Sequence, residues 1–133
     1  MSTQSITIDL PINRPRNEVW DAITTPGGIA GWWVAGNIAP VVGHRFTLDM
    51  GNWGLVECVV IEATPLERLV YAFADWKLSW ILAEEDGATR LTLEHSGFNL
   101  DNPRHQLAFD AMSKGWRESL LPRLASTLYA EPA

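Results

Sequence analysis

His95 is the residue of this sequence best suited to chemistry. In the segment 90–96, Leu91 and Leu93 alternate with polar residues and share one strand face with His95. Leucines of a half-buried strand face the core, so the alternation predicts that His95 points inward. An inward histidine at a strand end can orient a ligand's carbonyl or hydroxyl group, or move a proton near neutral pH. The alternative is a structural histidine bonded to a nearby backbone carbonyl, and the sequence leaves both interpretations open.

Tyr71 is the second polar group that strand alternation turns inward. In the segment 69–73 it shares a face with Leu69 and Phe73, whereas the other face carries only valine and alanine. The tyrosine hydroxyl would then be a second polar group in an otherwise apolar space.

Apolar residues are expected to wall the space around these two polar groups. Strand parity turns Phe46, Leu48 and Trp80 inward, and the pair Trp32-Trp33 is expected to pack down as a lid. The predicted ligand-binding residues are Trp32, Trp33, Phe46, Leu48, Tyr71, Trp80, Leu93, His95, Met112 and Trp116.

Known catalytic and metal-binding motifs are missing from the sequence. It has no Gly-rich phosphate loop, no serine nucleophile elbow and no pair of cysteines, since Cys58 stands alone. The histidines at positions 44, 95 and 105 lack the four-residue spacing of a zinc helix. We therefore expect no catalytic residue, no metal and no cofactor, and a solvated side chain for His105.

Length and composition indicate one domain, residues 1–133, with a hydrophobic content of 47 %. The net charge of −6 would repel a polyphosphate, so a nucleic-acid partner is not expected. No apolar run approaches a membrane span and no secretory signal is evident, which favours a soluble cytoplasmic protein without a membrane partner. The seven tryptophans are unusual, because a small core rarely has room for so many indoles, each with an N–H that needs a partner.

The longest predicted element is an amphipathic helix over 101–129. Pro103 suits its first turn, and Trp116 lies at the middle of its apolar face. Pro122 lacks an N–H and its ring strikes the carbonyl four residues earlier, so we expect a kink near residues 118–122. An ordinary core helix with an awkward proline and a helix bent over a cavity both fit this pattern.

The rest of the chain predicts a strand, two short helices separated at Pro26-Gly27-Gly28, and a meander of five strands. Short turns, of which Asp86-Gly87 is the strongest, connect successive strands, which must therefore be antiparallel neighbours. Pro11 restricts the first strand to a sheet edge or to its own end. The strands are expected at 5–12, 43–50, 55–63, 68–74, 78–85 and 89–96, and the short helices at 16–24 and 29–34.

Several of these segments together resemble one known family. The segment 15–24, followed by Trp32-Trp33, resembles the opening signature of proteins similar to the C-terminal domain of the activator of the heat-shock-protein-90 ATPase, within the START and birch-pollen-allergen-like superfamily. Further matches are 43–50, 65–71, 87–98 and Gly115-Trp116. The resemblance implies an α+β helix-grip fold, in which a curved antiparallel sheet wraps the long C-terminal helix and leaves an apolar cavity between them.

The resemblance also bears on the strand 55–63, where Glu57 and Glu62 fall on opposite faces and make the orientation ambiguous. Aligning Val60 with the family's inward valine puts Cys58 inside and Glu57 outside. An inward Glu57 would instead have a raised pKa and would be the best acid–base candidate in the chain.

The resemblance allows several functions, because members of this superfamily carry lipids, bind hormones, close polyketide rings or assist a chaperone. We expect a non-catalytic binding protein for a small apolar or aromatic ligand, such as a lipid or a polyketide-like compound. The alternative is a cyclase or dehydratase in which His95 or Tyr71 moves a proton. A chaperone-activating module comes third, and a chaperone partner is not expected because 133 residues leave no room for the extra domain of the eukaryotic cochaperone. The sequence leaves a homodimer open.

Overall fold

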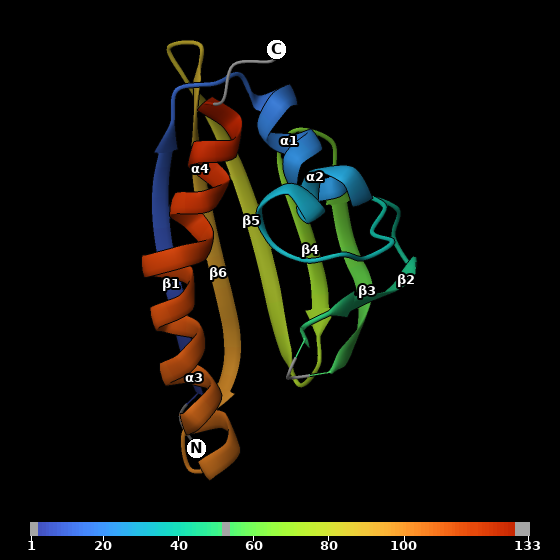
Figure 1. Cartoon of the computed structure of the whole chain (residues 1–133), viewed down its shortest axis with the longest axis vertical. Helices are drawn as coiled ribbons and strands as arrows, with labels where there is room; N and C mark the ends of the chain where they lie inside the picture. Colours follow the sequence, from blue (N-terminus) through green and yellow to red (C-terminus); the bar gives the residue numbers. More distant parts are fainter. Residues whose placement is uncertain (1–2, 52–53, 130–133) are drawn as a thin grey trace.

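Within residues 3–51 and 54–129, which the computed structural model describes, six antiparallel strands form one curved sheet (Figure 1). The strands lie in the order β1 (Thr3–Ile12), β6 (Ala88–Asn99), β5 (Trp76–Glu85), β4 (Arg68–Phe73), β3 (Leu55–Thr64) and β2 (Arg45–Asp49). Successive strands from β2 to β6 are neighbours, and β1 closes the far edge beside β6. The predicted five-strand meander and the edge position of the first strand are confirmed.

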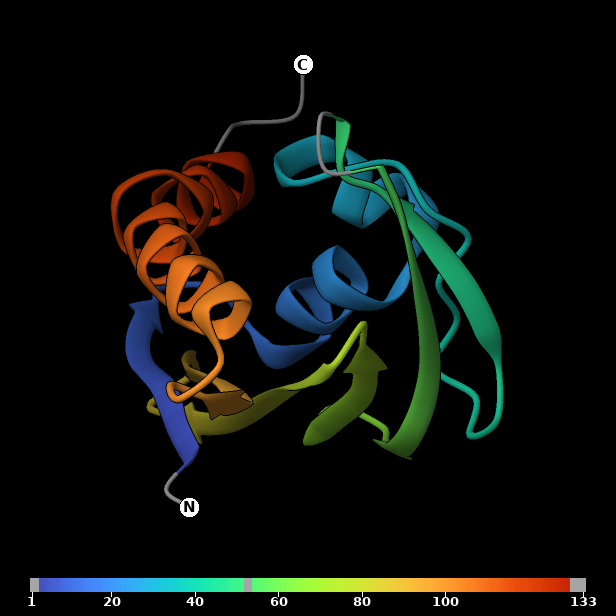
Figure 2. The ribbon, with the colours of Figure 1, turned by 90° about the horizontal axis from the view of Figure 1, so that it is seen from below.

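Helices lie on the concave side of this sheet. Seen along the strands, the sheet curves around α1 and α2 on one side and around the C-terminal helix on the other (Figure 2). The helical elements are α1 (Arg16–Thr24), α2 (Pro26–Trp32), α3 (Pro103–Gly115), a π-helical turn (Trp116–Leu120) and α4 (Leu121–Tyr129). The predicted α+β helix-grip architecture is confirmed. Among the described helices, none is long and apolar enough to cross a membrane.

The second short helix begins earlier than predicted. The segment 26–28, expected as a break, forms the first turn of α2. Thr25 stabilises this turn, because its Oγ1 accepts a hydrogen bond from the backbone N–H of Gly28 at 3.0 Å. Gly28 also packs so closely on α1 that a Cβ atom there would collide with the carbonyl oxygen of Asp21. The tight α1–α2 pair fixes the position of the two tryptophans at the end of α2.

A β-bulge in β3 resolves the ambiguity over its two glutamates. The pairing register shifts between Val60 and Glu62, so Ile61 is an extra residue, and its side chain is 51 % exposed. The bulge resets the alternation and leaves both Glu57 and Glu62 exposed. Cys58 is buried, as the resemblance implied, and the alternative of an inward Glu57 is wrong.

The C-terminal helix changes its winding where the kink was expected. The backbone N–H of Leu121 bonds the carbonyl oxygen of Trp116, five residues earlier instead of four. This wider turn ends just before Pro122, which has no N–H to donate. In a regular α-helix, residues five apart point about 140° away from each other. Here Trp116 and Leu121 are both buried, so the π-helical turn directs both side chains into the core.

Candidate ligand site

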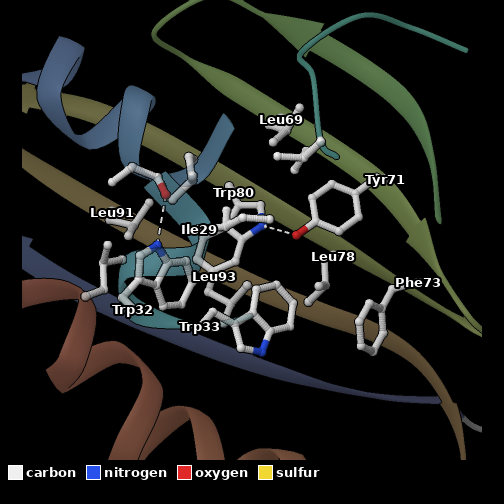
Figure 3. Close-up of a cluster of buried hydrophobic side chains, with 14 of the residues drawn as sticks. Ile29, Trp32, Trp33, Leu69, Tyr71, Phe73, Leu78, Trp80, Leu91 and Leu93 are labelled. Carbon is white, nitrogen blue, oxygen red and sulfur yellow. Dashed lines mark hydrogen bonds between the residues drawn. The ribbon is translucent and has the colours of Figure 1, made fainter. Parts of the chain in front are cut away.

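Four tryptophan side chains form a closed ring of indoles on the concave side of the sheet. Trp32 ends α2 and Trp33 directly follows it, Trp80 comes from β5 and Trp116 from the π-helical turn. Their ring centroids are separated by 5.6 Å (32–33), 5.1 Å (33–116), 5.6 Å (116–80) and 5.8 Å (80–32). Figure 3 shows three of these indoles, Trp32, Trp33 and Trp80, packed beside the leucines of β5 and β6. This four-tryptophan ring occupies the space that the resemblance assigned to a cavity.

Three of the four indoles donate their N–H to partners inside the protein. Trp32 donates to a backbone carbonyl of α1 at 2.8 Å, and Trp80 donates to the hydroxyl of Tyr71 at 3.1 Å (Figure 3). Trp116 donates to Nδ1 of His95 at 3.0 Å. Tyr71 and His95, the two polar groups that the sequence singled out, thus accept hydrogen bonds from tryptophans. Paired indoles of this kind can be buried in a small core.

His95 is buried and neutral, and its tautomer follows from its partner. Burial lowers the pKa of His95 to about 3, so the imidazole carries one proton near neutral pH. An indole N–H only donates, and therefore the Nδ1 that accepts from Trp116 is unprotonated and the proton lies on Nε2. Nε2 has no hydrogen-bond partner among the described residues. The pKa of His95 thus lies far below the range that suits proton transfer at neutral pH, and no backbone carbonyl of the described residues accepts a hydrogen bond from its ring.

Three further aromatic rings surround His95. Phe73 and Trp76 meet its ring edge-on, at centroid distances of 5.6 and 6.1 Å, and Phe98 lies 4.7 Å away. Trp76 also has a buried Nε1 without a partner in the described part of the chain. This group of Phe73, Trp76 and Phe98, called the His95 aromatic box below, contains one side-chain N–H, that of Trp76, and no side-chain oxygen.

Sequence reasoning missed Phe98 because strict alternation places it on the face opposite to His95. In the structure, two residues separate these positions in β6, whereas one separates their partners Gln4 and Ile6 in β1. Gly97, with φ of +96°, takes up the extra residue, and both aromatic side chains turn inward. A glycine inside an alternating strand was the available signal for this bulge.

Tyr71 and Cys58 lie on the part of the concave face nearer to β2. Burial raises the pKa of Tyr71 well above its usual range and raises the pKa of Cys58 to about 12. Phe46 packs edge-on against Tyr71, with ring centroids 5.2 Å apart. Neither group ionises near neutral pH, so both contribute packing and hydrogen bonding and no charge.

The ten predicted ligand-binding residues all belong to this core or pack against it. Nine of them are buried, and Met112 on α3 is half-buried. The structure therefore brings them together, and their contact with a ligand stays a prediction. Among the described residues, no three His, Cys, Asp or Glu side chains are grouped so that they could hold a metal ion.

Helix α3 covers the His95 aromatic box without burying any of its own residues. Its two largest inward side chains, Phe109 and Met112, are only half-buried. Phe109 meets Phe98 edge-on, with ring centroids 5.3 Å apart. The helix therefore covers an aromatic surface while making few buried contacts of its own.

His105 ties the start of α3 to the sheet. Its Nδ1 accepts a hydrogen bond from the backbone N–H of Asn99 at 3.0 Å, and its Nε2 lies 3.5 Å from the carboxylate of Asp75. The prediction of a solvated His105 is wrong, because its side chain is 12 % exposed. These contacts hold α3 at its N-terminal end.

Two hollows on the described surface lie away from the four-tryptophan ring. One, of about 930 Å³, is on the outer face of β2, β3 and β4 and includes Arg45, Leu55 and Glu57 in its lining. The other, of about 400 Å³, lies where Pro11 and Tyr129 approach the β5–β6 turn. Because the four indoles contact one another, a ligand that enters between them has to displace some of these side chains.

Comparisons with known proteins agree with this architecture. The family model described as Activator of Hsp90 ATPase homolog 1-like protein matches residues 13–129. Protein MLL2253 from Mesorhizobium loti is 25 % identical with a TM-score of 0.84, covering 94 % of this chain and 96 % of that chain. BH1534 from Bacillus halodurans is 24 % identical with a TM-score of 0.82, covering 96 % and 99 %. CalU16 from Micromonospora echinospora is 24 % identical with a TM-score of 0.80, covering 98 % and 78 %. No curated protein sequence matches the chain.

Proposed function

We propose that this chain, which belongs to the family of Activator of Hsp90 ATPase homolog 1-like proteins, binds a small apolar or aromatic molecule between the curved sheet and α3. The observation that carries the proposal is the contrast between α3 and the surface beneath it. The helix buries none of its residues, while Phe73 and Phe98 below it are almost completely buried, at 3 % and 0 % exposed. A ligand that replaces half-buried side chains of α3 regains more apolar contact than it removes. Segments with few buried contacts are also those that open most readily.

Trp33 supports the proposal as a second movable part. It is 9 % exposed, against 0–1 % for the other members of the four-tryptophan ring. No hydrogen bond of its indole is seen in the described part of the chain, and ring contacts with Trp32, Phe73 and Trp116 hold it. Rotation of this one side chain would open the ring beneath α3 and leave the hydrogen bonds of the other three indoles intact.

Binding fits the polar groups of the core better than proton transfer does. A general acid or base works best with a pKa near the working pH. Burial moves the pKa of His95 far below neutrality and that of Tyr71 far above it. Each group is also already engaged by an indole N–H. These facts favour orientation of a ligand over cyclase or dehydratase chemistry.

Intrinsic tryptophan fluorescence tests the proposal, because the indoles form the walls of the site. The protein would be titrated with a panel of lipids, flavonoids and polyketide-like aromatic compounds. A saturable change with at least one compound is expected. The absence of any saturable change across the panel would overturn the proposal.

Two lysine variants of α3 test whether the ligand binds beneath this helix. Met112→Lys places a charge at the half-buried position above the aromatic box and is expected to weaken binding at least tenfold. Leu107→Lys, on the same helix at a position that is 63 % exposed, is the matched control and should bind as the wild type does. Equal weakening by both variants, or by neither, would place the ligand elsewhere.

A further inference from the structure

We infer that the ligand of this site carries a carbonyl oxygen, as in a ketone, ester, lactone or quinone, which accepts a hydrogen bond from Nε2–H of His95. The inference rests on the proposed binding function and specifies the chemical class of the ligand.

The direction of this hydrogen bond follows from the other side of the imidazole. Trp116 donates its indole N–H to Nδ1 of His95 at 3.0 Å. The indole has no acceptor atom, so it cannot adapt to a protonated Nδ1. As long as Trp116 holds this position, the neutral His95 presents a donor at Nε2. The tryptophan is thus the positioning residue, and His95 is the group that meets the ligand.

The core supplies no acceptor for this donor. His95 is 0 % exposed, and its Nε2 has no hydrogen-bond partner among the described residues. Its ring neighbours in the aromatic box, Phe73, Trp76 and Phe98, contain no side-chain oxygen. A buried donor without a partner destabilises a folded protein, so its presence in a packed core calls for an explanation. A ligand acceptor provides one.

The surroundings of His95 select a neutral group that only accepts. A carboxylate would be buried among aromatic rings without a cation, which is strongly unfavourable. A hydroxyl group or a water molecule brings protons of its own, and the box offers the unpartnered Nε1–H donor of Trp76 but no side-chain oxygen to receive those protons. A carbonyl oxygen has two lone pairs and no proton. It is therefore the group that fits this donor without creating another unpaired one.

The box also lies where a ligand can reach it. Phe98 forms one of its sides and contacts Phe109 of α3, with ring centroids 5.3 Å apart. Displacement of the half-buried α3 side chains, the route proposed above, therefore uncovers Phe98, whose ring centroid lies 4.7 Å from that of His95. An aromatic ligand with a carbonyl group could stack among these rings while its oxygen meets Nε2.

Matched pairs of compounds that differ only in the oxygen test the inference. The first pair is 9-fluorenone and fluorene, and the second is benzophenone and diphenylmethane. Wild-type protein is expected to bind the ketone of each pair about two- to tenfold more tightly, the range of a single hydrogen bond to a neutral partner. If neither member of either pair binds, both the carbonyl inference and binding of aromatic compounds fail. If both members bind equally well, the carbonyl inference fails and the binding function stands.

Variants at His95 test whether the preference for ketones depends on its Nε2–H donor. His95→Phe retains a ring but no donor, so the ketone preference should vanish while fluorene still binds. His95→Gln can accept from Trp116 with its amide oxygen and donate with its amide nitrogen, and should keep part of the preference. His44→Phe is the matched control, because His44 contacts Asn37 at 2.7 Å outside the box, and it should behave as wild type. A ketone preference that survives in His95→Phe would overturn the inference.

Nuclear magnetic resonance of the wild-type protein gives a measurement that does not depend on variant folding. With ¹⁵N-labelled histidine, the proton of His95 should be found on Nε2 and not on Nδ1. Addition of 9-fluorenone should shift this N–H proton to lower field, and addition of fluorene should not. A proton on Nδ1, or equal shifts with both compounds, would contradict the inference.

Discussion

Trp116 and His95 form a hydrogen-bonded pair, in which the indole N–H from the π-helical turn meets Nδ1 on β6 at 3.0 Å. The pair connects the C-terminal helix to the sheet at the centre of the aromatic core. The same bond that stabilises the core also places the proton of His95 on Nε2, where it has no partner among the described residues. Substitutions in the C-terminal helix that move Trp116 should therefore change the hydrogen bonding of His95.

Removal of the Trp116 side chain should destabilise the fold strongly. The indole is 0 % exposed, so Trp116→Ala is expected to lower the free energy of unfolding by about 3–5 kcal/mol. Trp116→Phe keeps most of the volume but leaves Nδ1 of His95 without a donor, and a loss of about 1–3 kcal/mol is expected. Urea unfolding followed by far-UV circular dichroism measures both values, with the exposed Leu107→Ala as control. A loss below about 1 kcal/mol for Trp116→Ala would show that the indole borders open space.

His95 should make the fold less stable in acid. Its pKa is about 3 in the folded chain against an ordinary value of 6.5, so below pH 6.5 the unfolded chain binds a proton that the folded chain does not. Above pH 6.5 the free energy of unfolding has the full contribution of neutral His95. This contribution is lost as the pH falls toward 3, with a slope of at most about 1.4 kcal/mol per pH unit. Between pH 7 and pH 4.5 the wild type should lose about 2–3 kcal/mol relative to His95→Gln.

Urea unfolding of wild type and His95→Gln at a series of pH values measures this difference. Carboxylates contribute to the acid dependence of both proteins in the same way, and the comparison removes them. Parallel stability curves for the two proteins would contradict a neutral, buried His95.

Strand alternation predicted the inward side chains wherever the strands are regular. Tyr71, Trp80 and His95 all lie on the face that parity assigned to them. Parity failed where an extra residue interrupts a strand, at Ile61 in β3 and at Gly97 in β6, because each bulge reverses the alternation beyond it. The glycine was a visible signal for one bulge, whereas the isoleucine carries no comparable signal.

The content of the interior could not be predicted from alternation or from family resemblance. Both indicate which residues face inward, and neither gives the separation of the sheet from the helices. That separation decides whether the four indoles line a cavity or touch each other, and here they touch at centroid distances of 5.1–5.8 Å. The pairing of Trp116 with His95 was likewise hidden, because it joins residues 21 positions apart across two elements.

The π-helical turn should depend on its two buried anchors and not only on Pro122. Trp116 and Leu121 are both buried, and a regular α-helix would turn one of them away from the core. Pro122→Ala leaves these anchors in place, so the free energy of unfolding should change by less than about 1 kcal/mol. Deletion of the exposed Ser119 instead brings the anchors four residues apart and restores a regular α-helix.

In the Ser119-deletion background the proline lies inside a regular helix, where it is about 3 kcal/mol less favourable than alanine. Adding Pro122→Ala to the deletion should therefore stabilise the protein by about that amount. Urea unfolding is measured for the wild type, the two single changes and the double change. The four free energies of unfolding give the coupling energy between Pro122→Ala and the deletion of Ser119. An equal effect of Pro122→Ala in both backgrounds would contradict a turn maintained by the buried anchors.

Adjacent glycines in the first turn of α2 should respond in opposite directions to alanine. A Cβ atom at Gly28 would collide with the backbone of Asp21 and Ala22 in α1, so Gly28→Ala should lower the free energy of unfolding by about 1–3 kcal/mol. Gly27 has nothing within 4 Å of that position, and Gly27→Ala should raise it by about 0.5–1 kcal/mol through reduced backbone entropy of the unfolded chain. Because Trp32 ends α2 and Trp33 directly follows it, Gly28→Ala alone should also alter the near-UV circular dichroism. Equal stability changes for the two variants would show that close packing of α1 on α2 does not position the tryptophans.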